Sequence, residues 1–191
     1  MKMINIYKNC LSKYPYLTRM FTSGLILSTA DFTYQTFFEK RETYDFKRIG
    51  INYTVGFIAA PWLFVWFNKI QPQTLKFLLG KPLNTPIYDK VTKKISYDRL
   101  IAKMLLDYFI CFPVMQLIYH VNFNILYNNN LESIYNAFET KVSFSLQNYH
   151  QAWPVASCLI HLFVPAYLKA ICANISGTTW NNYVNYLFSS K

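Results

Sequence analysis

The sequence predicts an all-α integral membrane bundle of about four transmembrane helices, forming a single membrane domain over residues 1–191. Hydrophobic residues make up 53% of the chain and charged residues only 15%, below the usual quarter. The stretch from Ile49 to Asn68 carries no formal charge, and its twenty residues would span the roughly 30 Å core of a bilayer as a helix. Basic residues flank this stretch, and aromatic residues near its ends are typical of membrane interfaces.

The four helices are expected at residues 17–38, 46–70, 100–127 and 149–175, with a long basic loop at 71–98. Short interfacial helices are expected at the N-terminus, in the 128–147 connector and in the aromatic C-terminal tail. An even number of spans puts both termini beside the 71–98 loop, on a side with fourteen of the nineteen Lys and Arg residues. The positive-inside rule then orients that side toward the matrix or cytoplasm.

The formal net charge of +10 raises the question of an anionic partner. Lys and Arg lie between apolar runs and form no basic–aromatic RNA motif, so the pattern favours the lipid bilayer, including anionic lipid such as cardiolipin, over nucleic acid. Candidate headgroup contacts are Lys90, Lys93 and Lys94, although the same residues fit a solvated loop. The four cysteines form no C-x-x-C pair, which indicates buried thiols rather than a disulfide framework.

Small and polar residues recur on one face of the first helix. Gly24, Ser28, Asp31 and Gln35 follow a spacing of four, three and four, so they share that face. Lipid cannot satisfy such groups, which predicts that they face other helices or line a pore. Asp31 is therefore either a pore-lining carboxylate or a helix-packing residue bonded to a partner.

The third helix carries polar residues on two faces. Gln116, His120 and Asn124 share one face, whereas Asp107 lies nine positions before Gln116 and is expected to project about 180° away. The spacing of four between Lys103 and Asp107 predicts a local ion pair. One of the two polar faces is then expected to serve a partner or loop rather than the bundle interior.

No residue pattern supports catalysis or a cofactor. The sequence contains no nucleophile elbow, P-loop or H-E-x-x-H motif. Cys158 and His161 alone are too few ligands for zinc, so His161 is expected to be a hydrogen-bonded packing residue. The chain is predicted to be no enzyme and to need no cofactor and no metal.

Several motifs run in order along nearly the whole chain. The first helix contributes Gly24, Asp31 and Gln35, and the tail contributes Trp180-Asn181-x-Tyr183. This order resembles the Mpv-seventeen/peroxisomal membrane protein of twenty-two kilodaltons family, whose members are small four-helix membrane proteins. The resemblance implies packing roles for Asp45, Arg48, Gly56, Pro61, Trp66, Pro113, Trp153, Pro154, Pro165, Trp180 and Asn181.

The departures from the family pattern fall on polar positions. Ala30 stands where the family has Gly, and Tyr108 stands where it has Gln. After Trp153-Pro154, the family's Gln and Asn-Phe are replaced by Ser157 and by Ile160-His161, and a later Arg is Lys169. These changes put a family-type polar pathway in doubt and leave the packing motifs intact.

The resemblance implies a pore, whereas the altered polar positions and the two polar faces of the third helix favour an accessory subunit, so two functions are considered. The first is a non-catalytic accessory subunit packed against other membrane subunits of a mitochondrial inner-membrane assembly, of respiratory-chain or ATP-synthase type. The alternative is a small-solute-permeable pore of the mitochondrial inner or the peroxisomal membrane. The basic start, with no acidic residue before Asp31, resembles a mitochondrial address that we expect to be retained.

Overall fold

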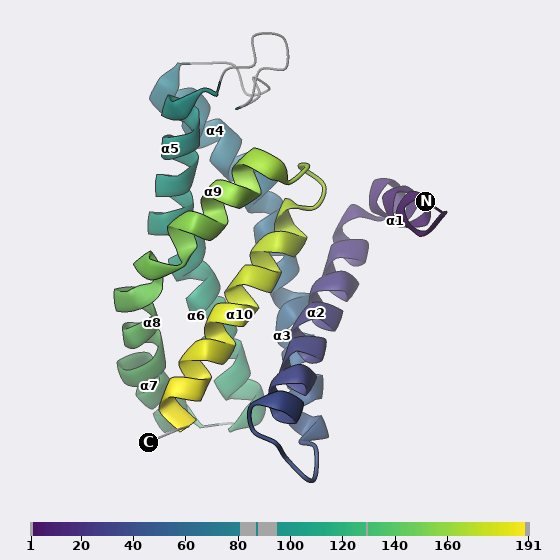
Figure 1. Cartoon of the computed structure of the whole chain (residues 1–191), viewed down its shortest axis with the longest axis vertical. Helices are drawn as coiled ribbons and strands as arrows, with labels where there is room; N and C mark the ends of the chain where they lie inside the picture. The colour runs from purple at the N-terminus through teal and green to yellow at the C-terminus, as the bar shows by residue number, and fades with distance from the viewer. Residues whose placement is uncertain (1, 81–86, 88–94, 129, 190–191) are drawn as a thin grey trace.

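The computed structural model describes residues 2–80, 87, 95–128 and 130–189 (Figure 1). Helices make up nearly all of this part of the chain, and no β-strand occurs in it. The all-α prediction is therefore confirmed. The candidate headgroup residues Lys90, Lys93 and Lys94 lie outside the described residues.

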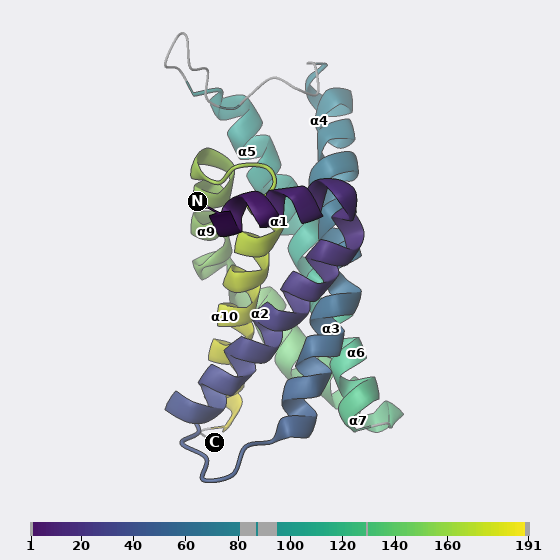
Figure 2. The same cartoon turned by 90° about the vertical axis from the view of Figure 1, so that its right-hand side faces the viewer.

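The helices run up and down one elongated bundle (Figures 1 and 2). Helix α1 lies crosswise at the upper end, α2 descends, and the chain then climbs, descends, climbs again and finally descends along α10. In chain order the helical segments are α1 (Lys2–Lys13), α2 (Pro15–Phe37), α3 (Phe46–Val65), η1 (Trp66–Ile70), α4 (Gln71–Leu79), α5 (Tyr97–Leu106), η2 (Asp107–Cys111), α6 (Phe112–Tyr127), α7 (Leu131–Ala137), η3 (Phe138–Val142), α8 (Ser143–Asn148), η4 (Tyr149–Gln151), α9 (Trp153–Phe163) and α10 (Lys169–Ser189).

Two continuous helices are long and apolar enough to cross a membrane. The first joins α3, η1 and α4 over Phe46–Leu79, and the second joins α5, η2 and α6 over Tyr97–Tyr127. The segments η1, η2 and η3 are π-helical turns, in which the chain accommodates an extra residue without ending the helix. The first of these helices continues through residues 71–79, which the sequence analysis assigned to the loop.

The C-terminal third of the chain differs most from the prediction. The expected helix at 149–175 is interrupted between Phe163 and Lys169, where Pro165 lacks the N–H that a continuing helix needs. The connector expected to lie at an interface instead climbs the side of the bundle as α7 and α8, and leads into α9 (Figure 1). Residues 180–189 are not an interfacial tail, because they belong to α10, where Trp180 and Asn181 are buried.

This additional pass along the bundle changes the position of the C-terminus. The N-terminal helix and the end of α4 lie in the upper part of the bundle, whereas the C-terminal end of α10 lies at the lower end (Figure 1). The prediction that both termini share one end is therefore wrong for this structure. The physical reason is that α10 runs the length of the bundle rather than stopping near residue 175.

Local chemistry explains where several helices begin and end. Asp45 caps α3, because its side chain accepts a hydrogen bond from the Arg48 backbone N–H. Prolines occupy the first turn of α2 and α9, where a missing N–H leaves no helical bond unmade. Pro72 and Pro113 instead follow η1 and η2 directly, inside the two continuous helices. Gly80 ends α4 with a φ of 60°, a left-handed conformation that costs glycine little.

The closest helix contact joins α2 and α3. A Cβ atom on Gly56 would lie 2.6 Å from the Ser23 backbone oxygen, and one on Gly24 would lie 2.9 Å from Tyr53. These two glycines let the backbones approach, as small residues do between membrane helices. Further up the bundle, the apolar core includes Leu63, Trp66, Phe112 and Trp153.

Candidate functional site

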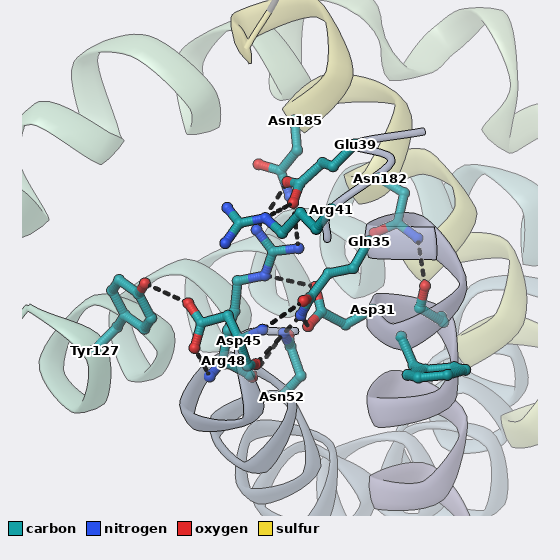
Figure 3. A network of polar contacts seen from close by, with 12 residues as sticks. Asp31, Gln35, Glu39, Arg41, Asp45, Arg48, Asn52, Tyr127, Asn182 and Asn185 are labelled. Carbon is teal, nitrogen blue, oxygen red and sulfur yellow. Dashed lines mark hydrogen bonds and ion pairs between the residues drawn. The ribbon is translucent and has the colours of Figure 1, made fainter. Parts of the chain in front are cut away.

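Two polar clusters, one partly buried and one fully buried, lie at different heights in the bundle. We call the lower one the Asp31 cluster, formed by Asp31, Gln35, Glu39, Asp45 and Arg48 (Figure 3). We call the upper one the Asp107 cluster, formed by Trp66, Gln71, Asp107, Ser157 and His161. The apolar core around Phe112 and Trp153 separates them along the bundle.

The Asp31 cluster centres on the Arg48 guanidinium, which two carboxylates neutralise. Its Nε lies 2.9 Å from Asp31 Oδ1, and its Nη1 lies 2.8 Å from Glu39 Oε1. Gln35 is fully buried and donates to Asp31 Oδ2 at 2.9 Å. The structure thus gives Asp31 two partners, and a carboxylate paired in this way remains stable away from water.

The loop before α3 is fastened to the same cluster. Gln35 Oε1 accepts a hydrogen bond from the Asp45 backbone N–H at 2.7 Å, and the Tyr127 hydroxyl donates to Asp45 Oδ2 at 2.7 Å (Figure 3). The hydrogen bonds from the Arg48 N–H and from the Tyr127 hydroxyl hold the pKa of Asp45 below its usual range. At Glu39, burial raises the pKa, whereas the hydrogen bonds from Arg48 and Arg41 lower it. The net result is a pKa below the usual range.

A partly open cavity of about 420 Å³ adjoins the Asp31 cluster. Its lining is rich in groups that form hydrogen bonds, and includes Asn52, Tyr119, His120, Asn124, Asn136 and Lys141. The Nε2 atom of His120 is buried and has no hydrogen-bond partner among the described residues. Lys141 also lines the cavity, and its Nζ donates to Asn185 Oδ1 at 3.1 Å. The cavity can therefore offer several donors and acceptors to a small polar molecule.

The Asp107 cluster satisfies one buried carboxylate with four side chains. Asp107 Oδ1 accepts from Trp66 Nε1 at 2.8 Å and from Gln71 Nε2 at 2.7 Å. Its Oδ2 lies 2.8 Å from Ser157 Oγ and 2.7 Å from His161 Nε2. Asp107 is only 1% exposed, so the cluster joins three stretches of chain within the bundle.

The predicted ion pair between Lys103 and Asp107 does not form, because other donors occupy both carboxylate oxygens. The prediction that one polar face of this helix would serve a partner or loop is also wrong, because Asp107 and Gln116 are both buried. The π-helical turn η2 begins at Asp107 and adds a residue without advancing the helix. Asp107 is thus rotated by roughly 80° from Gln116, instead of about 180° as in a regular helix.

The Asp107 cluster does not have the geometry of a catalytic triad. In a triad the serine bonds to the histidine, whereas here Ser157 and His161 each contact the same carboxylate oxygen. His161 is a hydrogen-bonded buried residue, as expected. Within the described part of the chain, no group of three or more His, Cys, Asp or Glu residues could hold a metal ion.

The other predicted polar residues divide between packing and solvent. Gly24 contacts Tyr53 of α3 and lines no described cavity, and the Ser28 hydroxyl donates to its own helix at Leu25 O. Only Asp31 of the predicted polar face lines the 420 Å³ cavity, and Gln35 supports it from behind. The sequence analysis did not identify Lys141 and Asn52 as cavity residues. The spacing of four between Arg48 and Asn52 does indicate that these two share a helix face.

Deeper in the bundle, the space between the two clusters is nearly closed. A cavity of about 30 Å³ remains there, lined by residues that include Leu63, Phe112, Gln116, Trp153 and Asn181. Gln116 Oε1 and Asn181 Oδ1 are buried without a hydrogen-bond partner in the described structure. The conformation is therefore closed between the lower cavity and the Asp107 cluster.

An all-helical bundle with two apolar helices of membrane-spanning length and paired charges inside fits the class of small helical membrane proteins. The chain is 25% identical to Protein SYM1 of Candida albicans, over 98% of this chain and 97% of that protein. It is 22% identical to PXMP2/4 family protein 2 of Dictyostelium discoideum, over 100% of this chain and 93% of that protein. These homologues belong to the Mpv17/PMP22 family, so the predicted resemblance is confirmed. No family model and no solved structure matches the chain.

Proposed function

We propose that this chain is a non-catalytic, multi-pass membrane protein that admits small polar solutes through the cavity beside the Asp31 cluster. The observation that carries the proposal is a 420 Å³ polar cavity bordered by the paired charges of Asp31 and Arg48. Charged residues within membrane helices are expensive and usually face a water-filled cavity or a partner. The relationship to SYM1 and PXMP2/4 family proteins supports a mitochondrial or peroxisomal membrane, and we propose the mitochondrial inner membrane, with the peroxisomal membrane as the alternative.

The closed core above the cavity makes this a gated pathway. Phe112 and Trp153 pack within 5.0 Å of each other between ring centroids, and both line the 30 Å³ cavity. Passage of a solute would require these rings to separate. The unpartnered amide oxygens of Gln116 and Asn181 would then offer polar contacts along the opened path.

Conductance of the purified chain in planar bilayers tests this proposal. Asp31→Asn removes one charge from the cavity and leaves Arg48 paired with Glu39, so ion selectivity should change at least severalfold. The matched control is Glu42→Gln, which removes an exposed negative charge outside the cavity lining and should leave selectivity unchanged. A wild-type chain without conductance, or equal effects of the two substitutions, would refute the solute pathway.

A second candidate function is an accessory subunit of a larger membrane assembly. The observation in its favour is an apolar groove of about 690 Å³ between α2 and α10, lined by residues that include Leu25, Ile26, Phe38, Tyr183 and Tyr186. A helix of another subunit would bury these side chains, several of which are about half exposed or more.

Native-gel migration after mild detergent extraction separates this candidate from the first. Leu25→Gln should release a subunit from its assembly, whereas Phe109→Gln, at another exposed apolar position, should not. Deletion of the tail from Trp180 is unsuitable as a test, because Trp180 is buried and bonds to Ser145. Migration of the wild-type chain alone would exclude a stable assembly.

A further inference from the structure

Arg19 is a buried cation with no negatively charged partner in the part of the chain that the structure describes. Its side chain is only 9% exposed, and its Nη1 donates to the Pro15 backbone oxygen at 2.8 Å. The guanidinium carbon lies 4.3 Å from the ring centroid of Phe64, a cation–π contact. Among the described residues, the ionisable side chains that interact with Arg19 are those of Tyr7 and Tyr16, which are phenols and not carboxylates.

Among the described residues, no carboxylate forms an ion pair with Arg19. The first acidic residue of the chain is Asp31, twelve residues further along α2 and so about 18 Å away along the helix. Asp31 is already paired with Arg48. A buried guanidinium carries a large desolvation penalty unless an anion accompanies it, so an external anion is expected at Arg19.

A groove of about 290 Å³ lies beside Arg19, where α1 meets the bundle. Lys8 and Ser12 of α1 line one part of it, and Phe64 of α3 and Tyr167 line another. Lys8 Nζ lies 5.1 Å from the ring centroid of Tyr167, and no ion pair of Lys8 occurs among the described residues. The groove thus brings two cations together with a hydroxyl group and apolar walls.

The position of this groove matches the surface of a membrane. Helix α1 crosses the upper end of the bundle, while α2 runs along it (Figure 2). A basic amphipathic helix in this orientation is typical of the headgroup region. Below the groove, Leu17 and Phe21 of α2 are about half exposed, and together they provide an apolar path for an acyl chain.

We propose that the junction of α1 and α2 binds the phosphate group of an anionic membrane phospholipid, with Arg19 and Lys8 as its cationic contacts. Ser12 is placed to contribute a hydroxyl contact, and Leu11 and Phe64 contact the start of the acyl chain. The cations repel the choline of a zwitterionic lipid, so the site prefers a headgroup without a cation. The inference depends on membrane placement of the bundle but not on solute passage.

Native mass spectrometry of the full chain from mixed micelles tests this site. We expect one phosphatidylglycerol molecule to remain bound, and phosphatidylcholine to bind at least tenfold more weakly. Lys8→Gln and Arg19→Gln should each weaken phosphatidylglycerol binding by about tenfold, because each removes a charge-assisted contact. Lys13→Gln is the matched control on the same helix, since Lys13 is exposed and lies outside the groove lining.

The outcomes distinguish a lipid site from general attraction by basic residues. Equal weakening by Lys8→Gln and Lys13→Gln would overturn the proposal. Complete displacement of the lipid by excess inorganic phosphate would also overturn it, because the apolar walls would then add nothing. Arg19→Lys keeps the charge and should retain most of the binding. If Arg19→Gln fails to fold, the exposed residue Lys8 still decides the result.

Discussion

Each oxygen of the Asp107 carboxylate contacts two side chains, so an uncharged replacement cannot satisfy all four. In Asp107→Asn, the amide nitrogen would face donors where an oxygen now accepts. We expect Asp107→Asn to lower the free energy of unfolding by about 2–4 kcal/mol. Thermal unfolding in detergent measures this. Lys103→Gln should lower the free energy of unfolding by less than about 1 kcal/mol, because Lys103 forms no ion pair with Asp107. Equal losses for the two variants would contradict this assignment of contacts.

The hydrogen bond from Tyr127 to Asp45 makes a pH-dependent contribution to stability. Because the folded-state pKa of Asp45 is lowered, its stabilising effect is present above the unfolded pKa of about 4 and is lost as pH falls through the folded value. Tyr127→Phe should therefore cost about 1 kcal/mol at pH 7 and progressively less in acid. Melting curves between neutral and acidic pH check this, with Tyr183→Phe as a control that should show no such trend.

At the scale of single elements, regular helical periodicity explains the Asp31 cluster and fails at the Asp107 cluster. The spacing of four between Asp31 and Gln35 survives in the structure as a direct hydrogen bond. By contrast, no residue pattern in the sequence marks the π-helical turn η2, which rotates Asp107 into the bundle. Local register could be predicted only where the helix remained regular.

The contact between α2 and α3 depends on a missing side chain at Gly56. A Cβ there would lie 2.6 Å from the Ser23 backbone oxygen, so Gly56→Ala must push the helices apart. We expect a loss of about 2–3 kcal/mol in unfolding free energy. Gly50→Ala, in the same helix, meets nothing within 4 Å and should gain about 0.5–1 kcal/mol from helix propensity. Chemical denaturation measures the unfolding free energy of both variants. Equal changes in the two would contradict a role for close packing at Gly56.

For the whole molecule, composition predicted helices correctly, whereas the path of the chain required tertiary contacts. The break at Pro165 looked like one of several prolines within apolar runs, and nothing local distinguished it from Pro61, which lies inside α3. The role of Trp180 became clear only from its bond to Ser145 at 2.7 Å. Aromatic residues near a terminus fit a membrane interface and a protein core equally well. The prediction of an interfacial tail was therefore wrong, because Trp180 lies in the core.

The path of the chain makes a direct prediction about topology. The N-terminal helix and the C-terminal end of α10 lie at opposite ends of the bundle (Figure 1), so a bundle that crosses a membrane should expose its termini on opposite sides. Short epitope tags on each end, digested by protease before and after membrane permeabilisation, measure this. We expect one tag to be cleaved in sealed vesicles and the other only after permeabilisation. Equal protection of both tags would restore the even-pass topology and would mean that α10 does not cross with the other helices.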